Sequence, residues 1–389
     1  HPQVTYTQAV LVGLAEAGAT FVACDRRHMP VGMFMPLVAH HAQVERFAAQ
    51  ARAPRPLCKR IWQQVVRKKI ESQASALEHF YGSDEGLRAL VDAAHAAAGV
   101  ELVPALATFG HMAKLLTIPE YRYLAEDWGE GRYAAPEAED VDAQWKRRGW
   151  TLSPANPDSY PFLFSLFSEV LPLVRSPWCN IGCDETWDLG KGRSAEAAAE
   201  LGVGRVYLRH LLRLYEMAKE RGHRIQFWGD ILLHHPELVP ELPEDVILLD
   251  WHYEAADEYP SVDTFAESGR PFWVCPGTSS WNTLFPRIDN SNANIRTLAC
   301  LGTEHGAGGL LNTDWGDHGH YQPIGQCWYG YVFGLEQAWT GGTTPDEAFD
   351  PRFGRLFFGL QGEQVVATMR DLARLHALDG MSRPNASQS

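Results

Sequence analysis

Two adjacent carboxylates, Asp184 and Glu185, are the residues of this sequence best suited to acid–base chemistry. They follow the apolar run 179–183, which predicts a buried strand. Acids beside Thr186 could equally cap a helix and complement its dipole. Similar polar and aromatic residues follow five other predicted strands, and this repetition favours a catalytic role for the pair. The candidate site residues at those strand ends are His111, Trp228, Asp230, Trp251, Tyr253, Trp281, Asp314, Trp315 and Asp317.

A pair of acids below tryptophan side chains suits glycoside hydrolysis. One carboxyl must give its proton to the leaving oxygen, and a second group must stabilise positive charge at the anomeric carbon. Adjacent residues are poorly placed for the carboxylate separations of ordinary retaining or inverting pairs. They suit a mechanism in which the substrate's own 2-acetamido oxygen is the nucleophile and one acid orients it. The chain's 13 tryptophans offer flat apolar faces for sugar rings.

The elements that must position these residues alternate along the chain. From about residue 81, short apolar runs alternate with helical stretches, which is typical of parallel strands joined by crossover helices. The expected strands are 100–107, 178–183, 224–228, 246–251, 271–275 and 307–312, with 20–24 as a candidate first strand. The expected helices are 87–98, 159–173, 195–221, 262–268, 291–301 and 327–339.

This alternation predicts an α/β fold, a (β/α)8 barrel, in which the active site lies at the carboxyl ends of the strands. The barrel is expected to occupy residues 1–345, and a helical extension with a disordered tail is expected over 346–389. One further strand is needed between about residues 45 and 80, where the sequence is basic and polar and has no strand pattern.

Composition excludes several classes of function. The 48 acidic and 34 basic residues give a net charge of −14, which argues against nucleic acid as a partner. The apolar stretch 9–24 is interrupted by Glu16 and lacks a basic start, so we expect neither a secretion signal nor a membrane span. Seven widely spread cysteines predict buried free thiols. We therefore expect a cytoplasmic protein with a carbohydrate substrate and without metal or cofactor.

Several longer strings carry a resemblance to a known family. Ile181-Gly-Cys-Asp-Glu-Thr-Trp, with Phe109-Gly-His one strand earlier and Trp-Gly-Asp one strand later, resembles the catalytic domain of glycoside hydrolase family 20. The sequence is most similar to a bacterial branch that also carries Cys-Pro-Gly-Thr-Ser-Ser-Trp-Asn and Leu-Asn-Thr-Asp-Trp-Gly-Asp. The resemblance spans about residues 81–339. It implies β-N-acetylhexosaminidase activity.

The resemblance also implies a role for each matched residue. Glu185 would be the general acid/base, Asp184 would orient the acetamido group, and His111 would support the acid by hydrogen bonding. Tyr253 would bind the acetamido oxygen. Aromatic residues would wall the sugar pocket, namely Trp228, Trp251 and Trp315, with Trp281 as a further lining residue. Acidic residues would bind sugar hydroxyls, namely Asp230, Asp314 and Asp317.

The sequence departs from the family pattern in its first strands. The Asp-x-x-Arg of the first strand is replaced by Cys24-Asp-Arg-Arg-His, and the second strand is not recognisable. A Trp-x-Glu near the last strand is also missing, because Glu336 precedes Trp339. These departures leave two alternatives open, a glycosidase for a different terminal sugar and a non-catalytic carbohydrate-binding barrel. A separate alternative is a metal-dependent barrel enzyme, for which His111, Asp230 and Asp317 could supply three ligands.

Overall fold

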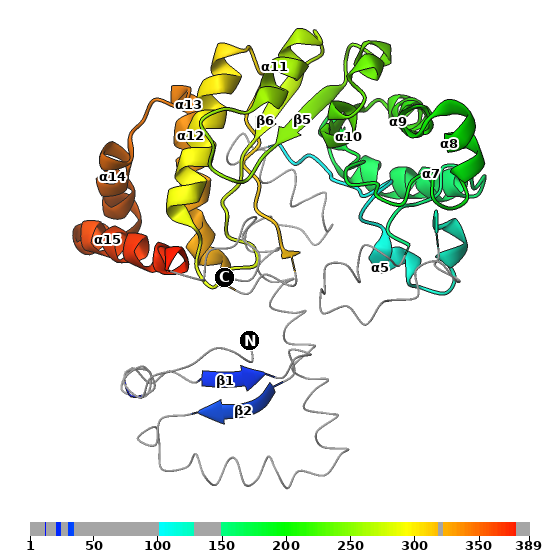
Figure 1. Cartoon of the computed structure of the whole chain (residues 1–389). Helices are drawn as coiled ribbons and strands as arrows, with labels where there is room; N and C mark the ends of the chain where they lie inside the picture. Colours follow the sequence, from blue (N-terminus) through cyan, green and yellow to red (C-terminus); the bar gives the residue numbers. More distant parts are fainter. Residues whose placement is uncertain are drawn as a thin grey trace, which may run out of the picture. The chain divides into compact units, whose positions relative to one another are not determined.

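The computed structural model describes residues 101–127, 149–317 and 322–378, with Val12 and two short strands nearer the N-terminus (Figure 1). The chain divides into two units, His1–Gly86 and Leu87–Ser389, and each is described by itself. The predicted helix 87–98 and the expected tail beyond 378 lie outside the described residues. The expected boundary at residue 345 stays a prediction.

In the first unit, β1 (Phe21–Cys24) pairs with β2 (Pro30–Phe34). The pairing is antiparallel, with Phe21 opposite Phe34. The prediction that 20–24 is the first strand of a parallel barrel is therefore wrong about its pairing, although a strand is present. The reason is the length of the connection, because the few residues between β1 and β2 can close a hairpin but cannot cross over to a parallel neighbour.

The second unit contains a parallel sheet that follows the order of the chain. Its strands are β3 (Trp178–Asn180), β4 (Arg224–Trp228), β5 (Ile247–Trp251) and β6 (Phe272–Cys275). Single parallel bridges extend the sheet at both edges, Ala105 to Asn180 on one side and Leu310 to Val274 on the other. All six strand segments predicted after residue 81 therefore lie side by side, in the sequential arrangement of a barrel wall.

Neighbouring residues of one strand enter different clusters, because successive side chains of a strand point to opposite faces. One face of the sheet joins the main core with helices α7 (Ser159–Val170) and α9 (Val203–Lys219), and the other forms a smaller cluster rich in tryptophan. Residues of the first face include Phe227, Leu248 and Val274. Residues of the second face include Trp228, Leu249 and Cys275. The sheet thus presents its tryptophans on the face away from the helices.

The helices of the second unit follow the prediction with small shifts. Their bounds are α5 (Ala113–Leu116), α7 (Ser159–Val170), α8 (Ala195–Leu201), α9 (Val203–Lys219), α10 (Asp230–Leu233), α11 (Pro260–Glu267), α12 (Ile288–Glu304), α13 (Trp328–Thr340), α14 (Asp346–Phe358) and α15 (Gly362–Ala373). Gly202 divides the expected helix 195–221 into α8 and α9, since its φ of +87° cannot continue a helix. Helices α9, α11 and α12 pack against β4, β5 and β6 (Figure 1).

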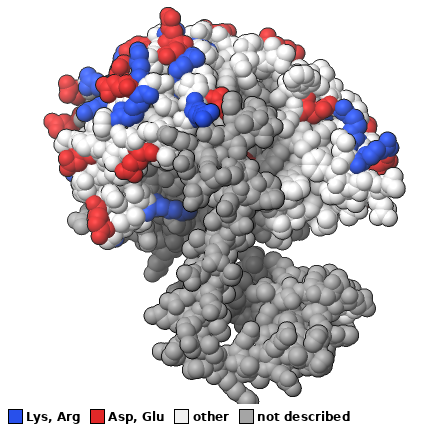
Figure 2. Space-filling view, turned by 180° about the vertical axis from the view of Figure 1, so that it is seen from behind, with Lys and Arg blue, Asp and Glu red and all other residues white. Residues whose placement is uncertain are grey.

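Charged side chains on one face of the second unit are not separated by sign (Figure 2). On the face seen in Figure 2, acidic and basic side chains of the described residues lie interspersed. None of the helices within the described ranges is long and apolar enough to cross a membrane.

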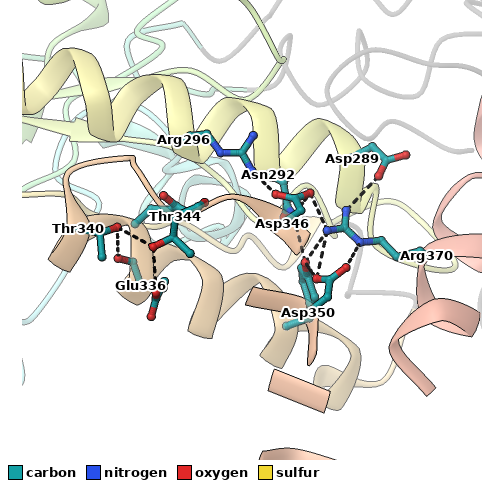
Figure 3. A network of polar contacts seen from close by, with 11 residues as sticks. Asp289, Asn292, Arg296, Glu336, Thr340, Thr344, Asp346, Asp350 and Arg370 are labelled. Atoms are coloured by element: carbon teal, nitrogen blue, oxygen red, sulfur yellow. Dashed lines mark hydrogen bonds and ion pairs between the residues drawn. The ribbon is translucent and has the colours of Figure 1, made fainter. Parts of the chain in front are cut away.

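One buried arginine joins α15 to the helices beside it. The Arg370 side chain is only 9% exposed and forms ion pairs with Asp289 at 3.0 Å, Asp346 at 2.6 Å and Asp350 at 3.0 Å (Figure 3). It also donates a hydrogen bond to the Tyr329 hydroxyl at 2.8 Å. These partners lie on α12, α13 and α14, so a single guanidinium holds four helices together.

Replacing Arg370 with alanine should therefore destabilise the second unit strongly. The change removes the guanidinium from three acids, of which Asp346 and Asp289 keep Arg296 and Arg374 while Asp350 keeps no ion pair among the described residues. Removing one partner of a buried ion pair costs about 3–5 kcal/mol. Chemical denaturation of R370A should show this loss. R355A is the matched control, because Arg355 is 76% exposed in its pair with Glu363. We expect R355A to lose less than about 1 kcal/mol. Equal losses of unfolding free energy in R370A and R355A would contradict the role of Arg370 in joining the helices.

Candidate active site

The two adjacent acids sit on a turn with an unusual backbone. After β3 the chain passes through left-handed φ values at Gly182 (+69°), Cys183 (+72°) and Glu185 (+50°). Left-handed conformations of residues other than glycine cost about 1–3 kcal/mol each and persist only where the surroundings enforce them. His111, the partner of the acids, is also left-handed at +60°. Strained backbone is therefore concentrated where the chemically useful side chains meet.

Buried hydroxyl groups hold this turn in place. The Thr108 hydroxyl donates to the Ile181 carbonyl at 2.6 Å, and the Tyr207 hydroxyl donates to the Cys183 carbonyl at 3.0 Å. Glycine is required at position 110, because a Cβ there would lie 2.1 Å from the Asp184 carbonyl oxygen. The strand end that carries His111 is thus pressed directly against the turn that carries the acids.

His111 lies between the two carboxylates. Its Nε2 is 2.9 Å from Asp184 Oδ2 and 3.3 Å from Glu185 Oε2. Burial alone would lower the pKa of His111, but the hydrogen bonds and charges of both carboxylates outweigh burial and raise it to about 10. The ring is therefore a cation at neutral pH, and it compensates the negative charge of the pair. The acid side chains remain partly open to solvent, Asp184 at 14% and Glu185 at 28%.

Two further side chains hold the main chain of Glu185. The Trp150 indole donates its Nε1–H to the Glu185 carbonyl at 2.9 Å, and Asp230 Oδ2 accepts the Glu185 N–H at 3.1 Å. The Trp150 ring stacks on Trp187 with centroids 5.2 Å apart and contacts His111 at 4.5 Å. Sequence reasoning missed Trp150, which follows no predicted strand, and gave no role to Trp187, although it belongs to the Asp-Glu-Thr-Trp string.

Asp230 lies half-buried beside the acid pair. Burial raises the pKa of Asp230, as do the charges of Asp184 and Glu185, whereas the hydrogen bond from the Glu185 N–H lowers it; the pKa is raised to about 7. Its Oδ1 is a buried oxygen without a hydrogen-bond partner among the described residues. Three carboxyl groups from the ends of β3 and β4 therefore meet here, and that of Asp230 is only partly ionised at neutral pH.

Predicted wall residues come together in one aromatic group. Trp228 and Trp315 lie with ring centroids 5.5 Å apart, and Trp251 stacks on Tyr253 at 5.1 Å. The Trp315 indole donates to the Tyr253 hydroxyl at 2.9 Å. Burial raises the pKa of Tyr253 well above its ordinary value, so the phenol keeps its proton. These four side chains come from three different strand ends and form a continuous surface.

Other candidates are placed differently. Trp281 is only 1% exposed and meets Tyr253 edge-on at 4.9 Å, so it lies behind the aromatic surface. Asp314 accepts hydrogen bonds from Thr278 at 3.0 Å, from Ser280 and from Tyr331, which use both of its oxygens. Asp317 is exposed, and residues 318–321 after it lie outside the described ranges. A hydroxyl-binding role for Asp314 would require it to exchange these protein partners for sugar.

A buried glutamate anchors the segment after the acid pair. Glu126 is 1% exposed, and its Oε1 accepts the Ser194 N–H at 2.8 Å and the Gly192 N–H at 3.3 Å. Its Oε2 accepts the Ser153 hydroxyl at 2.6 Å. The segment 190–194 is therefore tied to this carboxylate.

Donor atoms of His111, Asp184 and Glu185 lie within 4.8 Å of one another, a spacing that could also hold a metal ion. A metal would require the neutral imidazole, because a protonated ring has no free nitrogen lone pair. A metal bound there would therefore have to displace the proton of His111.

The opposite environments of two histidines give a test by NMR. His111 should stay protonated from pH 6 to 8.5. The buried His210, whose pKa burial lowers to about 4, should stay neutral down to about pH 5. Resonances can be assigned from H111N and H210N. Because the folded pKa of His111 lies above 6.5, its stabilising effect is complete below about pH 6.5 and is lost as the pH rises towards 10. A His111 midpoint near 6.5 would contradict the ion-pair geometry.

The chain has similarity to known proteins over most of its length. The model of "Glycosyl hydrolase family 20, catalytic domain" matches residues 58–281. Human Hexosaminidase D is 24% identical over 248 residues, which cover 58% of this chain and 47% of that protein. A shorter stretch of 68 residues is 40% identical to CRISPR-associated endonuclease Cas1 of Neisseria meningitidis serogroup C (strain 8013), covering 18% of this chain and 22% of that protein. The chain thus spans less than half of each of these relatives.

Among solved structures, the fold is similar to that of the Flavobacterium johnsoniae chitobiase FjGH20. The TM-score is 0.50 at 17% sequence identity, over 75% of this chain and 42% of that one. This similarity, the parallel strands in chain order and the polar strand ends agree on a (β/α)8 barrel. Since the family model matches more than half of the residues of this chain, the chain belongs to glycosyl hydrolase family 20.

Proposed function

We propose that the chain is a retaining exo-glycosidase that removes a terminal β-linked N-acetylhexosamine, N-acetylglucosamine or N-acetylgalactosamine. The observation that carries the proposal is the contact of His111 with two adjacent carboxylates beside the aromatic group. In this proposal the substrate's 2-acetamido oxygen is the nucleophile, which explains why the acids are neighbours in sequence.

Glu185 acts as the general acid and base. It is the more exposed of the two acids, at 28%, so its carboxyl can reach the glycosidic oxygen. In the first step Glu185 donates its proton to that oxygen while the acetamido oxygen attacks the anomeric carbon and the leaving group departs. In the second step Glu185 takes a proton from water, and the water oxygen opens the cyclic intermediate. Two displacements at the same carbon leave a product of retained configuration.

Asp184 orients the acetamido group and balances its positive charge. It is 14% exposed, and its carboxylate can accept the acetamido N–H as the oxygen moves towards the anomeric carbon. The charge of Asp184 extends to Tyr253, where it contributes to the raised pKa of the phenol. Since the Tyr253 oxygen already accepts a hydrogen bond from Trp315, its own proton can be donated to the acetamido oxygen.

The aromatic group supplies the apolar part of the site. Trp228, Trp251 and Trp315 offer flat faces to a sugar ring and to the acetamido methyl. His111 keeps the two acids at a fixed separation and holds a positive charge that limits their mutual repulsion. The described geometry contains groups for each proton transfer of this reaction, and no metal or cofactor takes part in a proposed step.

The two acids should respond differently to amide substitution. E185Q should lower kcat on 4-nitrophenyl β-N-acetylhexosaminides by at least about 10²-fold, because the amide cannot donate the proton, while substrate still binds. D184N should lose rate mainly on substrates with an acetamido group. E363Q is the control, since Glu363 is 63% exposed on α15. Release of 4-nitrophenol measures the activity of all three variants. Parent activity in E185Q would contradict the assignment of the acid.

A further inference from the structure

Asp230 has a place in the site that direct sugar binding does not explain. It begins the short helix α10 directly after β4, and Gly229 before it has no room for a side chain, because a Cβ would lie 2.5 Å from Phe265 Cζ. The corner between β4 and α10 is therefore fixed by packing. This corner directs the Asp230 carboxylate at the main chain of Glu185, whose N–H it accepts at 3.1 Å.

Asp230 and Trp150 each form a hydrogen bond with the main chain of Glu185, and we call these two bonds the clamp. Trp150 holds the Glu185 carbonyl at 2.9 Å, while Asp230 holds the N–H of the same residue. Glu185 lies between these contacts with φ at +50°, a conformation that a glutamate does not adopt without enforcement. Without one of the two bonds, the residue could relax to a right-handed or extended conformation, and its carboxyl would turn away from His111.

The carboxyl of Asp230 is costly where it lies. Its pKa is raised to about 7, so ionisation at this position opposes folding, and its Oδ1 is buried without a hydrogen-bond partner among the described residues. A group that destabilises the fold and touches the general acid indicates a functional role. Oδ2 already accepts the Glu185 N–H, and the buried Oδ1 is closed to a sugar hydroxyl.

We propose that Asp230 is a positioning residue for the general acid: by accepting the Glu185 N–H it maintains the left-handed backbone that directs the Glu185 carboxyl towards His111 and the scissile bond. This inference rests on the proposed function, because it gives Glu185 the role of the acid. It replaces the role in hydroxyl binding that the sequence indicated for Asp230.

The test compares two substitutions at position 230. D230A removes the acceptor, whereas D230N keeps an oxygen that can accept the Glu185 N–H. We expect kcat of D230A to fall about 10- to 100-fold, because a displacement of about 1 Å at a reacting group has an effect of this size. KM should change less than about 2-fold, and D230N should recover kcat to within about 5-fold of the parent. Circular dichroism and thermal unfolding establish that both variants fold.

A second variant tests the other end of the clamp. W150F keeps the stacking on Trp187 but loses the indole N–H that binds the Glu185 carbonyl, so it should lower kcat with little change in KM, as D230A does. A kcat of D230A equal to that of the parent would overturn the inference. A rise in KM at constant kcat in both D230A and D230N would also overturn it, because that result is expected of a residue that binds the sugar directly. If the parent cleaves no acetamido sugar, the proposed function itself fails.

Discussion

The arrangement of the site depends on one electrostatic constraint, which is that a positive imidazole must sit against two neighbouring carboxylates. His111 satisfies both acids at 2.9 and 3.3 Å, and it does so only because its strand end lies directly against the turn that carries them. That contact requires a glycine at position 110 and left-handed backbone at His111 and Glu185. The hydroxyls of Thr108 and Tyr207 then restrain the turn from the buried side.

The barrel wall provides the close contacts that His111 and Glu185 require. Parallel strands in chain order bring residues that are distant in sequence to one edge of the sheet, so His111, Glu185, Asp230 and Tyr253 converge from four strand ends. The alternation within each strand sends one side chain to the helices and the next to the tryptophan-rich face. A rigid support of this kind can hold strained residues, and the helices beyond it are joined by buried ion pairs such as those of Arg370.

Sequence patterns predicted the strands and their polar ends well, because apolar runs and the residues after them are local features. They could not predict the sheet that β1 joins, since strand periodicity says nothing about the partner. The hydroxyl-binding role of Asp314 was implied by the family resemblance and stays a prediction. Its hydrogen bonds with Thr278, Ser280 and Tyr331 could not be predicted, because those partners come from other segments. The clamp on Glu185 was missed because Trp150 and Asp230 are distant from Glu185 in sequence. The left-handed backbone of residues other than glycine could not be predicted, because no sequence pattern indicates it.

The configuration of the released sugar tests the proposed substrate-assisted hydrolysis most directly. Proton NMR of the first turnover products from 4-nitrophenyl β-N-acetylglucosaminide distinguishes the two anomers before they equilibrate. The account predicts that the β-anomer appears first, because two displacements take place at the anomeric carbon. Initial release of the α-anomer would mean that water attacks directly, and it would contradict the roles given to Asp184 and the acetamido group.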